Sequence, residues 1–476
     1  MERLTEVPVA VLNPERFKNV IPAERYEAFA GAVATARKQF AGRAVWNINS
    51  TARGGGVAEM LRSLLAYARG AGIDARWLVI PGGPEFFRIT KRIHNNLHGD
   101  PGDGGELGDA EADVYEQTLL QVLEDLARLV RPDDLVIVHD PQPAGLCKAL
   151  KGIGAVVLWR CHVGLDKPND VARSAWNFLK PHIEVADGFV FSRRAFVWEG
   201  LADDKITVIP PSIDAFSPKN QDLDPPTVSA VLATAHIEAG PSDALPSFLR
   251  EDGTPARVDR HARMIQDEAV PQGAQLVAQV SRWDRLKDPI GVMRGFATGI
   301  APHTDAHLVV AGPDVEAVSD DPEGTEVLRD CEDLWRDLEA DTRRRVHLAC
   351  LPMEDGEENA AMVNALQRRA TVVVQKSIAE GFGLTVAEAK WKGRPVVASR
   401  IGGIQDQIVD GVTGILIDDP RDLASYGRAV VELLNNPARA DAIGAAARER
   451  VRDEFLGPRH LMQYAELFAR LVASSA

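Results

Sequence analysis

Two glutamates, Glu380 and Glu388, bracket a short segment that runs from a predicted strand into a predicted helix. Gly381 and Gly383 lack a Cβ atom, so the backbone there can approach a ligand closely. The first N–H groups of the helix would point out of its start, where a phosphate binds well. Carboxylates on either side could accept hydrogen bonds from paired sugar hydroxyls. The plainer alternative is an ordinary turn with a solvated glutamate on each side.

A pair of cations follows another predicted strand. Arg282 and Lys287 lie five positions apart in a loop directly after residues 275–281. Two cations in such a loop could clamp a diphosphate and neutralise the charge that develops on it as it leaves. The alternative is a solvated arginine and lysine in a charged surface loop.

The N-terminal half contains a glycine turn. Gly54, Gly55 and Gly56 precede a predicted helix, so this turn tolerates an anion. The pattern is not G-x-G-x-x-G, and the dinucleotide fingerprint is therefore absent. A turn that is merely flexible is the alternative.

Two further polar residues come at the ends of predicted strands. His162 directly follows the strand at 156–161, and Asp140 follows the strand at 135–139. Ligands of open α/β sheets bind beside the carboxyl ends of the strands. A histidine there can equally be a satisfied core residue, and an aspartate before proline often only starts a turn.

These residues must be held by a repeating scaffold. Short apolar strands alternate with amphipathic helices along the chain, which predicts an α/β fold with parallel sheets covered by helices. The helix at 57–69 has one apolar stripe with three- and four-residue steps. Another helix is predicted at 114–130, and three more begin near Asp422, Arg439 and Arg459. Predicted strands lie at 43–50, 75–80, 135–139, 156–161, 188–192, 206–214, 275–281, 306–311, 346–351, 371–375, 395–399 and 414–417.

The chain length and its prolines suggest where the domains divide. A chain of 476 residues suits two domains better than one core. The strand predicted at 206–214 runs into a proline-containing connection, and prolines cannot continue a ladder, so we place the boundary there. We expect domains at 1–212 and 213–456, with the final helix, about 457–476, packed back on the first. Residues 222–272 are irregular and suggest an inserted helical excursion or a mobile segment.

Composition restricts the class of protein. The net charge of -15 argues against a general nucleic-acid binder, which usually has a basic face. No apolar run approaches the ~18 residues that span a bilayer, so no membrane association is expected. The N-terminus shows no apolar signal segment, and the four cysteines form no C-x-x-C pair. We therefore expect a cytoplasmic protein with ordinary buried thiols.

The segment 379–388 resembles the E-x7-E motif of retaining GT-B glycosyltransferases of family 4, in both glutamates and the EGFGL string. The N-terminal half is more specific, and it resembles the trehalose glycosyltransferring synthases. The resemblance covers about residues 40–470 and implies a GT-B fold, in which two Rossmann-like domains face each other across a cleft. The strings that carry it are VWNINST at 45–51, GGGVAE at 54–59, ARWLVI at 75–80, EFF at 85–87, TK at 90–91, HN at 94–95, HDPQP at 139–143 and WRCH at 159–162.

The resemblance implies roles for the candidate residues. Those expected at the reaction centre are Arg282, Lys287, Glu380 and His162. Those expected to bind the donor are Gly55, Gly56, Gly381, Phe382, Gly383, Leu384, Thr385 and Glu388. Those expected to bind the acceptor are Asp140, Gly54 and Lys91.

The implied reaction is reversible formation of α,α-trehalose from an NDP-glucose (UDP-, ADP- or GDP-glucose) and free glucose, with retention by front-face transfer. No metal ligand set is expected and the motif requires no cofactor, although a loosely bound Mg²⁺ ion stays open as a stimulant. A homodimer also stays open. The alternatives are a trehalose phosphorylase, a GT-B-fold sugar-nucleotide epimerase and a non-catalytic sugar-nucleotide sensor.

Overall fold

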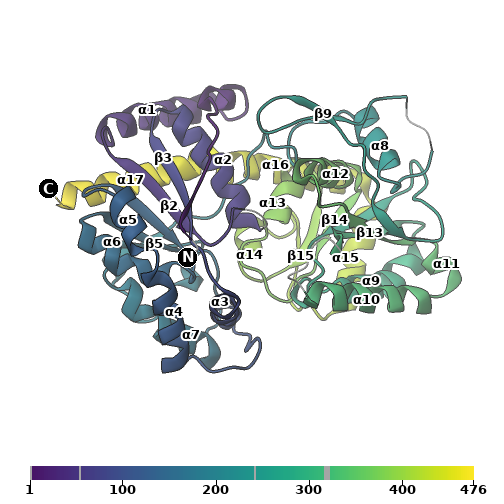
Figure 1. The fold of residues 1–476 in the computed structure, drawn as a ribbon. Coiled ribbons are helices and arrows are strands. Elements are labelled where there is room, and N and C mark those ends of the chain that lie inside the picture. The colour runs from purple at the N-terminus through teal and green to yellow at the C-terminus, as the bar shows by residue number, and fades with distance from the viewer. Residues whose placement is uncertain (1–2, 53–54, 241–242, 316–321, 476) are drawn as a thin grey trace. The chain divides into compact units, whose positions relative to one another are not determined.

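The computed structural model describes residues 3–52, 55–240, 243–315 and 322–475. The chain divides into two compact units (Figure 1). The first unit comprises Met1–Ser212 together with Phe455–Ala476, and the second comprises Ile213–Glu454. No helix in the described part of the chain is long and apolar enough to cross a membrane.

The first unit is built on a seven-stranded sheet of order β1-β3-β2-β4-β5-β6-β7. Only β1 runs antiparallel to its neighbour, β3. The sheet comprises β1 (Thr5–Val7), β2 (Ala44–Asn49), β3 (Asp74–Val79), β4 (Leu135–His139), β5 (Val156–Cys161), β6 (Gly188–Phe191) and β7 (Ile206–Val208). Its α-helices are α1 (Ala23–Gln39), α2 (Gly56–Gly70), α3 (Pro84–Leu97), α4 (Asp109–Leu120), α5 (Leu123–Leu129), α6 (Cys147–Ile153), α7 (Asp170–Ile183) and α17 (Gly457–Ser475).

Alternating residues of the strands form two cores on opposite faces of this sheet. Val136 and Val138 of β4 belong to one apolar cluster, whereas Leu135 and Ile137 belong to another that includes Phe468 of α17. Both faces are apolar because both are covered by helices, as expected for a mainly parallel sheet.

The second unit has the same plan. Its seven-stranded sheet has the order β10-β13-β12-β11-β14-β15-β16, and only β10 is antiparallel to its neighbour. The strands are β10 (Arg263–Ile265), β11 (Leu276–Val280), β12 (His307–Pro313), β13 (Val346–Leu351), β14 (Val372–Gln375), β15 (Val396–Ser399) and β16 (Ile415–Ile417). Its α-helices are α8 (Pro225–Thr234), α9 (Pro289–Gly295), α10 (Pro322–Asp337), α11 (Ala340–Arg343), α12 (Gly356–Arg369), α13 (Leu384–Trp391), α14 (Ile404–Gln407), α15 (Leu423–Asn435) and α16 (Pro437–Glu454).

Two expectations from the sequence need correction. The single helix predicted at 114–130 is wrong, because two helices, α4 and α5, occupy this stretch. The backbone N–H groups of Gln121 and Val122 bond three residues back, which interrupts the α-helical ladder between them. The irregular segment 222–272 is not mainly helical: besides α8 it forms the hairpin β8 (Ser247–Leu249) with β9 (Pro255–Arg257), and the edge strand β10.

Each sheet has one point where the strand order reverses. This switch lies between β2 and β4 in the first unit, and between β11 and β14 in the second. Open α/β sheets bind ligands beside the carboxyl ends of the strands at such a switch. The glycine turn follows β2, Asp140 follows β4, Arg282 follows β11 and Glu380 follows β14, so these candidate residues come from the strands that flank the two switches.

The C-terminal helix α17, yellow in Figure 1, completes the first unit. It packs beside α1, where the buried rings of Phe468 and Phe40 meet edge to face with centroids 6.2 Å apart. The C-terminal segment, which follows the second unit in the sequence, therefore contributes to the core of the first unit.

We expect Phe468→Ala to lower the free energy of unfolding of the first unit by about 3–5 kcal/mol, because it leaves a cavity in a packed core. Urea unfolding followed by tryptophan fluorescence measures this. Glu466→Ala, on the same helix but exposed, is the matched control and should change little. Equal stability of the two variants would show that α17 contributes no core to the first unit.

Candidate active site

The turn between β14 and α13 places several predicted residues at a helix start. Gly383 is the N-cap of α13 with φ 82°, a conformation that favours glycine. A Cβ atom there would lie 3.0 Å from Ile404, so the position has little room for a side chain. Leu384 and Thr385 form the first turn of α13, whereas the neighbouring Phe382 is buried.

A second glycine pair supports this turn from the loop after β15. The Gly403 N–H donates to the Gly381 carbonyl at 2.8 Å. A Cβ atom on Gly402 would lie only 1.8 Å from the Glu380 carbonyl oxygen, so the two backbones touch. The side chain of Gln407 donates to the carbonyls of Phe382 and Gly383. Gly402, Gly403 and Gln407 were not predicted from the sequence, where their only signal was a glycine pair after a predicted strand.

Lys287 and Glu380 are brought together. The Lys287 ammonium lies 2.8 Å from Glu380 Oε2, and the Ser377 hydroxyl donates to the same oxygen at 3.4 Å. Both charged side chains are largely shielded from solvent. A cation and a carboxylate are thus held side by side before the N-terminus of α13. Arg282 differs: it is 57% exposed and pairs with Asp284 at 3.1 Å.

The position of Lys287 depends on a buried ion pair beside it. Lys376 is buried, and its ammonium contacts the Asp288 carboxylate and donates to the Pro420 carbonyl at 2.6 Å. Asp288 has φ 51° and caps α9 by accepting from the Gly291 N–H at 3.0 Å. These bonds fix the loop that carries Lys287. Neither Lys376 nor Asp288 was predicted from the sequence.

Glu388 is buried inside α13. Its carboxylate is 3% exposed, and Lys219 lies 3.8 Å from Oε1. Oε2 has no hydrogen-bond partner among the described residues. A buried carboxylate oxygen without a donor is unfavourable, so a ligand hydroxyl would be a favourable partner. Lys219 was also missed, because it is far from Glu388 in the sequence.

In the first unit, Asp140 directly follows β4 and adopts φ 62°, which aspartate tolerates better than most residues. Its Oδ1 accepts from the backbone N–H of His162 at 2.8 Å. Burial raises the pKa of Asp140 to about 7, although this hydrogen bond and the nearby charge of Arg160 act in the opposite direction. Asp140 and His162 are therefore close neighbours, as their strand ends predict.

The ring of His162 is engaged on both nitrogens. Nε2 lies 3.0 Å from Nδ1 of His139, and Nδ1 accepts from Nε of Arg160 at 3.3 Å. His139 Nε2 in turn lies 2.9 Å from the side-chain oxygen of Asn47. Burial first, and then the charge of Arg160, hold the pKa of both histidines well below the ordinary value, so both rings are neutral. This geometry favours His162 as a positioning residue, and its direct part in catalysis stays a prediction.

The remaining candidate residues of the first unit belong to the glycine turn before α2 and to helix α3. Gly55 is the N-cap of α2 with φ 80°, and Gly56 is the first residue of that helix. Gly54 lies outside the described residues. Lys91 is exposed on α3, whereas the neighbouring Arg92 is buried and bonded to Asp103.

The raised pKa of Asp140 predicts a pH-dependent stability. Between its ordinary value of 3.8 and about 7, the folded protein keeps a proton that the unfolded chain has lost. The free energy of unfolding therefore falls as pH rises through this window. Asp140→Asn keeps the acceptor oxygen but has no carboxyl group to ionise, so it removes this fall in the free energy of unfolding. The free energy of unfolding of the variant relative to the wild-type protein should therefore be higher at pH 8 than at pH 5, by about 1–3 kcal/mol. Denaturant unfolding at the two pH values measures it.

Asp133→Asn is the matched control for this substitution, because Asp133 also has positive φ, at 66°, but is exposed. The control should show no comparable difference between the two pH values. The same small effect at both pH values in Asp140→Asn would mean that Asp140 ionises normally in the folded protein.

Known protein families match both halves of the chain. Residues 47–198 match the family described as "Trehalose synthase, N-terminal domain", and residues 261–450 match "Glycosyl transferases group 1". The trehalose synthase of Rubrobacter xylanophilus is 35% identical over 464 residues, with 96% of each chain covered. The trehalose phosphorylase of Grifola frondosa is 24% identical over 432 residues, which cover 85% of this chain and 54% of that protein.

A solved structure shows the fold. The α,α-trehalose 6-phosphate synthase of Burkholderia multivorans superposes with a TM-score of 0.65 at 16% identity, covering 91% of this chain and 99% of that one. The predicted GT-B fold is confirmed by this likeness and by the two mainly parallel sheets. With both family matches and the close relative together, the chain belongs to the trehalose synthase family of glycosyltransferases.

Proposed function

We propose that the protein is a retaining glucosyltransferase that forms α,α-trehalose reversibly from an NDP-glucose and free glucose. The observation that carries this proposal is the β14–α13 turn. There the Lys287–Glu380 pair lies before a helix N-terminus, and a buried Glu388 oxygen has no hydrogen-bond donor among the described residues. Such a turn suits a ligand that combines a diphosphate with hydroxyl groups.

In this proposal the second unit binds the donor. Lys287, Arg282 and the first N–H groups of α13 neutralise the diphosphate. Glu388 accepts hydrogen bonds from the ribose diol through its buried Oε2, and Glu380 accepts from hydroxyls of the transferred glucose. Mg²⁺ acts at most as a loosely bound stimulant.

The first unit provides the acceptor residues in the same proposal. Asp140 holds glucose hydroxyls, and the glycine turn before α2 and Lys91 contribute further contacts. Asp140 is suited to this because its pKa near 7 lets the carboxyl group either donate or accept a hydrogen bond at neutral pH.

The proposed chemistry is a front-face transfer. The bond from the anomeric carbon to the phosphate oxygen breaks, and the acceptor hydroxyl oxygen bonds to that carbon on the same face. The acceptor proton moves to the leaving phosphate oxygen, so neither Glu380 nor Asp140 is needed as a nucleophile or base. Binding interactions that neutralise the leaving diphosphate therefore provide most of the rate enhancement.

The likeness to trehalose phosphorylases supports a second candidate, in which inorganic phosphate replaces the nucleotide. One set of incubations separates the two functions. The protein is incubated with glucose and UDP-, ADP- or GDP-glucose, and separately with trehalose and either NDP or phosphate. Trehalose formed from an NDP-glucose, with cleavage that depends on NDP, supports the proposal. Cleavage that depends on phosphate alone overturns it in favour of the phosphorylase.

Variations of these incubations also test the remaining alternative functions. Conversion of donor without acceptor would identify an epimerase, and donor binding without turnover would identify a sensor. Glucose 6-phosphate as a better acceptor than glucose would place the protein with the trehalose-phosphate synthases instead.

Removal of either clamp cation should slow transfer. We expect Lys287→Ala and Arg282→Ala each to lower kcat by about two orders of magnitude or more, through loss of a charge that stabilises the leaving diphosphate. Arg285→Ala is the control, because Arg285 lies in the same loop but pairs with Glu326 and Asp330. Near-normal turnover of both clamp variants would remove the diphosphate role.

Glu388 should contribute to the affinity for the donor and not to the rate of glycosyl transfer. A ribose contact is equally strong in the ground and transition states, so Glu388→Ala should raise the donor KM about tenfold or more with little change in kcat. Steady-state kinetics with the best donor, and titration calorimetry with the free NDP, measure the two effects. A large fall in kcat at unchanged donor affinity would contradict the ribose role.

A further inference from the structure

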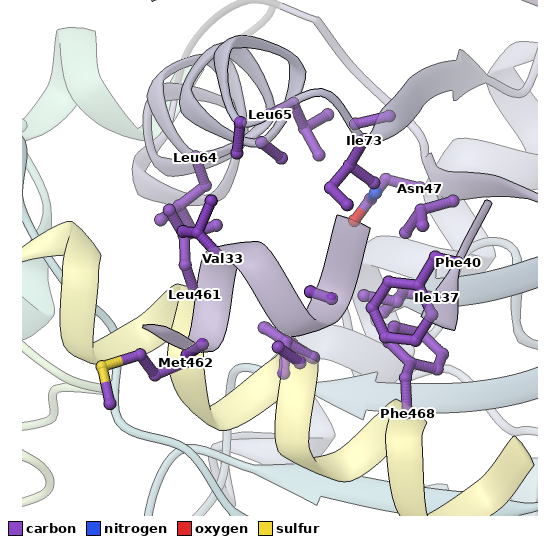
Figure 2. A pocket seen from close by; sticks show the side chains of 18 of the residues that line it. Val33, Phe40, Asn47, Leu64, Leu65, Ile73, Ile137, Leu461, Met462 and Phe468 are labelled. Carbon is purple, nitrogen blue, oxygen red and sulfur yellow. The ribbon is translucent and has the colours of Figure 1, made fainter. Parts of the chain in front are cut away.

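The first unit contains an apolar cavity that the proposed function does not use. It lies among α1, α2, α17 and the adjoining face of the sheet (Figure 2). Its volume is about 100 Å³. All of the residues that line it belong to the first unit. Nearly all are aliphatic or aromatic, such as Val33, Leu64, Leu65, Ile137, Leu461 and Phe468.

The wall of this cavity includes one amide with a free donor. Asn47 of β2 is 2% exposed and points toward the cavity (Figure 2). Its Oδ1 is occupied by His139, but Nδ2 has no hydrogen-bond partner among the described residues. The other two polar side chains of the wall are engaged: His139 bonds to Asn47 and His162, and the Tyr464 hydroxyl accepts from Arg160.

These features restrict the occupant. A water molecule in a protein interior needs two to four polar partners, whereas apolar cavities stay dry and bind apolar guests. An engineered apolar cavity of roughly 150 Å³ binds benzene or xenon. A sugar carries a hydroxyl on almost every carbon, and burial here would leave most of them without partners. The occupant is therefore neither donor nor acceptor sugar.

We propose that this cavity is a binding site for a small apolar molecule, no larger than about the size of benzene, whose single hydrogen-bond acceptor faces Nδ2 of Asn47. The apolar walls recognise the body of the ligand, and the unsatisfied amide recognises its acceptor. The same amide is joined through His139 and His162 to Asp140, so the site adjoins the polar network at the carboxyl edge of the sheet.

The test uses the full-length protein and two matched probes, cyclopentanone and cyclopentane, which share a ring but differ in the carbonyl acceptor. Saturation-transfer NMR gives their dissociation constants, and crystals pressurised with xenon locate the cavity. We expect xenon inside the cavity and a cyclopentanone affinity about tenfold above that of cyclopentane, the value of one satisfied hydrogen bond.

Two alanines of α1 supply matched variants. Ala32 lines the cavity, whereas Ala34 is exposed two positions along the helix. Ala32→Leu fills part of the space and should weaken cyclopentanone binding about tenfold or more, while Ala34→Leu should change it less than about twofold. In Asn47→Leu the preference for the carbonyl should disappear.

Several results would overturn the proposal. A crystal without xenon in the cavity, or equal cyclopentanone binding by Ala32→Leu and wild-type protein, would exclude the site. Equal affinity for the two probes on the wild-type protein would exclude recognition by Asn47, even if its substitution prevents folding. None of these measurements depends on glycosyl transfer, so they fail or succeed separately from the proposed activity.

Discussion

A cation buried near the carboxyl edge of the sheet organises each unit. In the first, Arg160 is fully buried, and its guanidinium bonds to His162, His460, Tyr464 and the Ile209 carbonyl. A buried charge is tolerated only when its donors are satisfied, so the end of β7, helix α17 and the ring of His162 must all hold their positions. In the second unit Lys376 does the same through Asp288 and the Pro420 carbonyl. Removal of one partner would leave an uncompensated charge, which is why the surrounding loops are held together.

These cations also explain how the candidate residues are positioned. Asp288 follows Lys287 directly in the sequence, so the ion pair with Lys376 fixes the backbone from which Lys287 reaches Glu380. Arg160 holds the imidazole of His162, whose backbone N–H fixes the carboxylate of Asp140. Residues that contact no ligand in the proposed reaction therefore set the geometry of those that do. A preorganised charge needs such support, because it stabilises a transition state only if it does not have to move.

The sequence was informative wherever a local pattern decides the structure. Alternating strands and helices predicted the α/β units, and residues at strand ends were found at the switch points because parallel topology leaves few other places for them. Contacts between distant segments were beyond such reasoning: nothing near Glu388 indicates Lys219, nothing near Glu380 indicates Gly402, and nothing near Asp288 indicates Lys376. The break between α4 and α5 was missed because an unbroken apolar period does not show where the hydrogen-bond ladder shifts. For His162 the strand end was right, yet its ring partners come from Arg160 and His139, whose side-chain directions no spacing rule gives.

The electrostatics of the first unit bear on how a neutral acceptor would be preferred in the proposed reaction. His139 and His162 are neutral, so Arg160 and Asp140 are left as the charged or titrating groups of this network. The guanidinium of Arg160 is already bonded to His162, His460, Tyr464 and the Ile209 carbonyl within the first unit. A neutral hydroxyl can pair with Asp140 in either protonation state, since the carboxyl group accepts when ionised and donates when protonated. A phosphate ester would need a cation in place of Asp140. An ionised Asp140 carboxylate would repel the ester. In the proposed reaction, therefore, an uncharged polyol can pair with Asp140 in both protonation states, whereas a phosphorylated one is repelled once Asp140 is ionised.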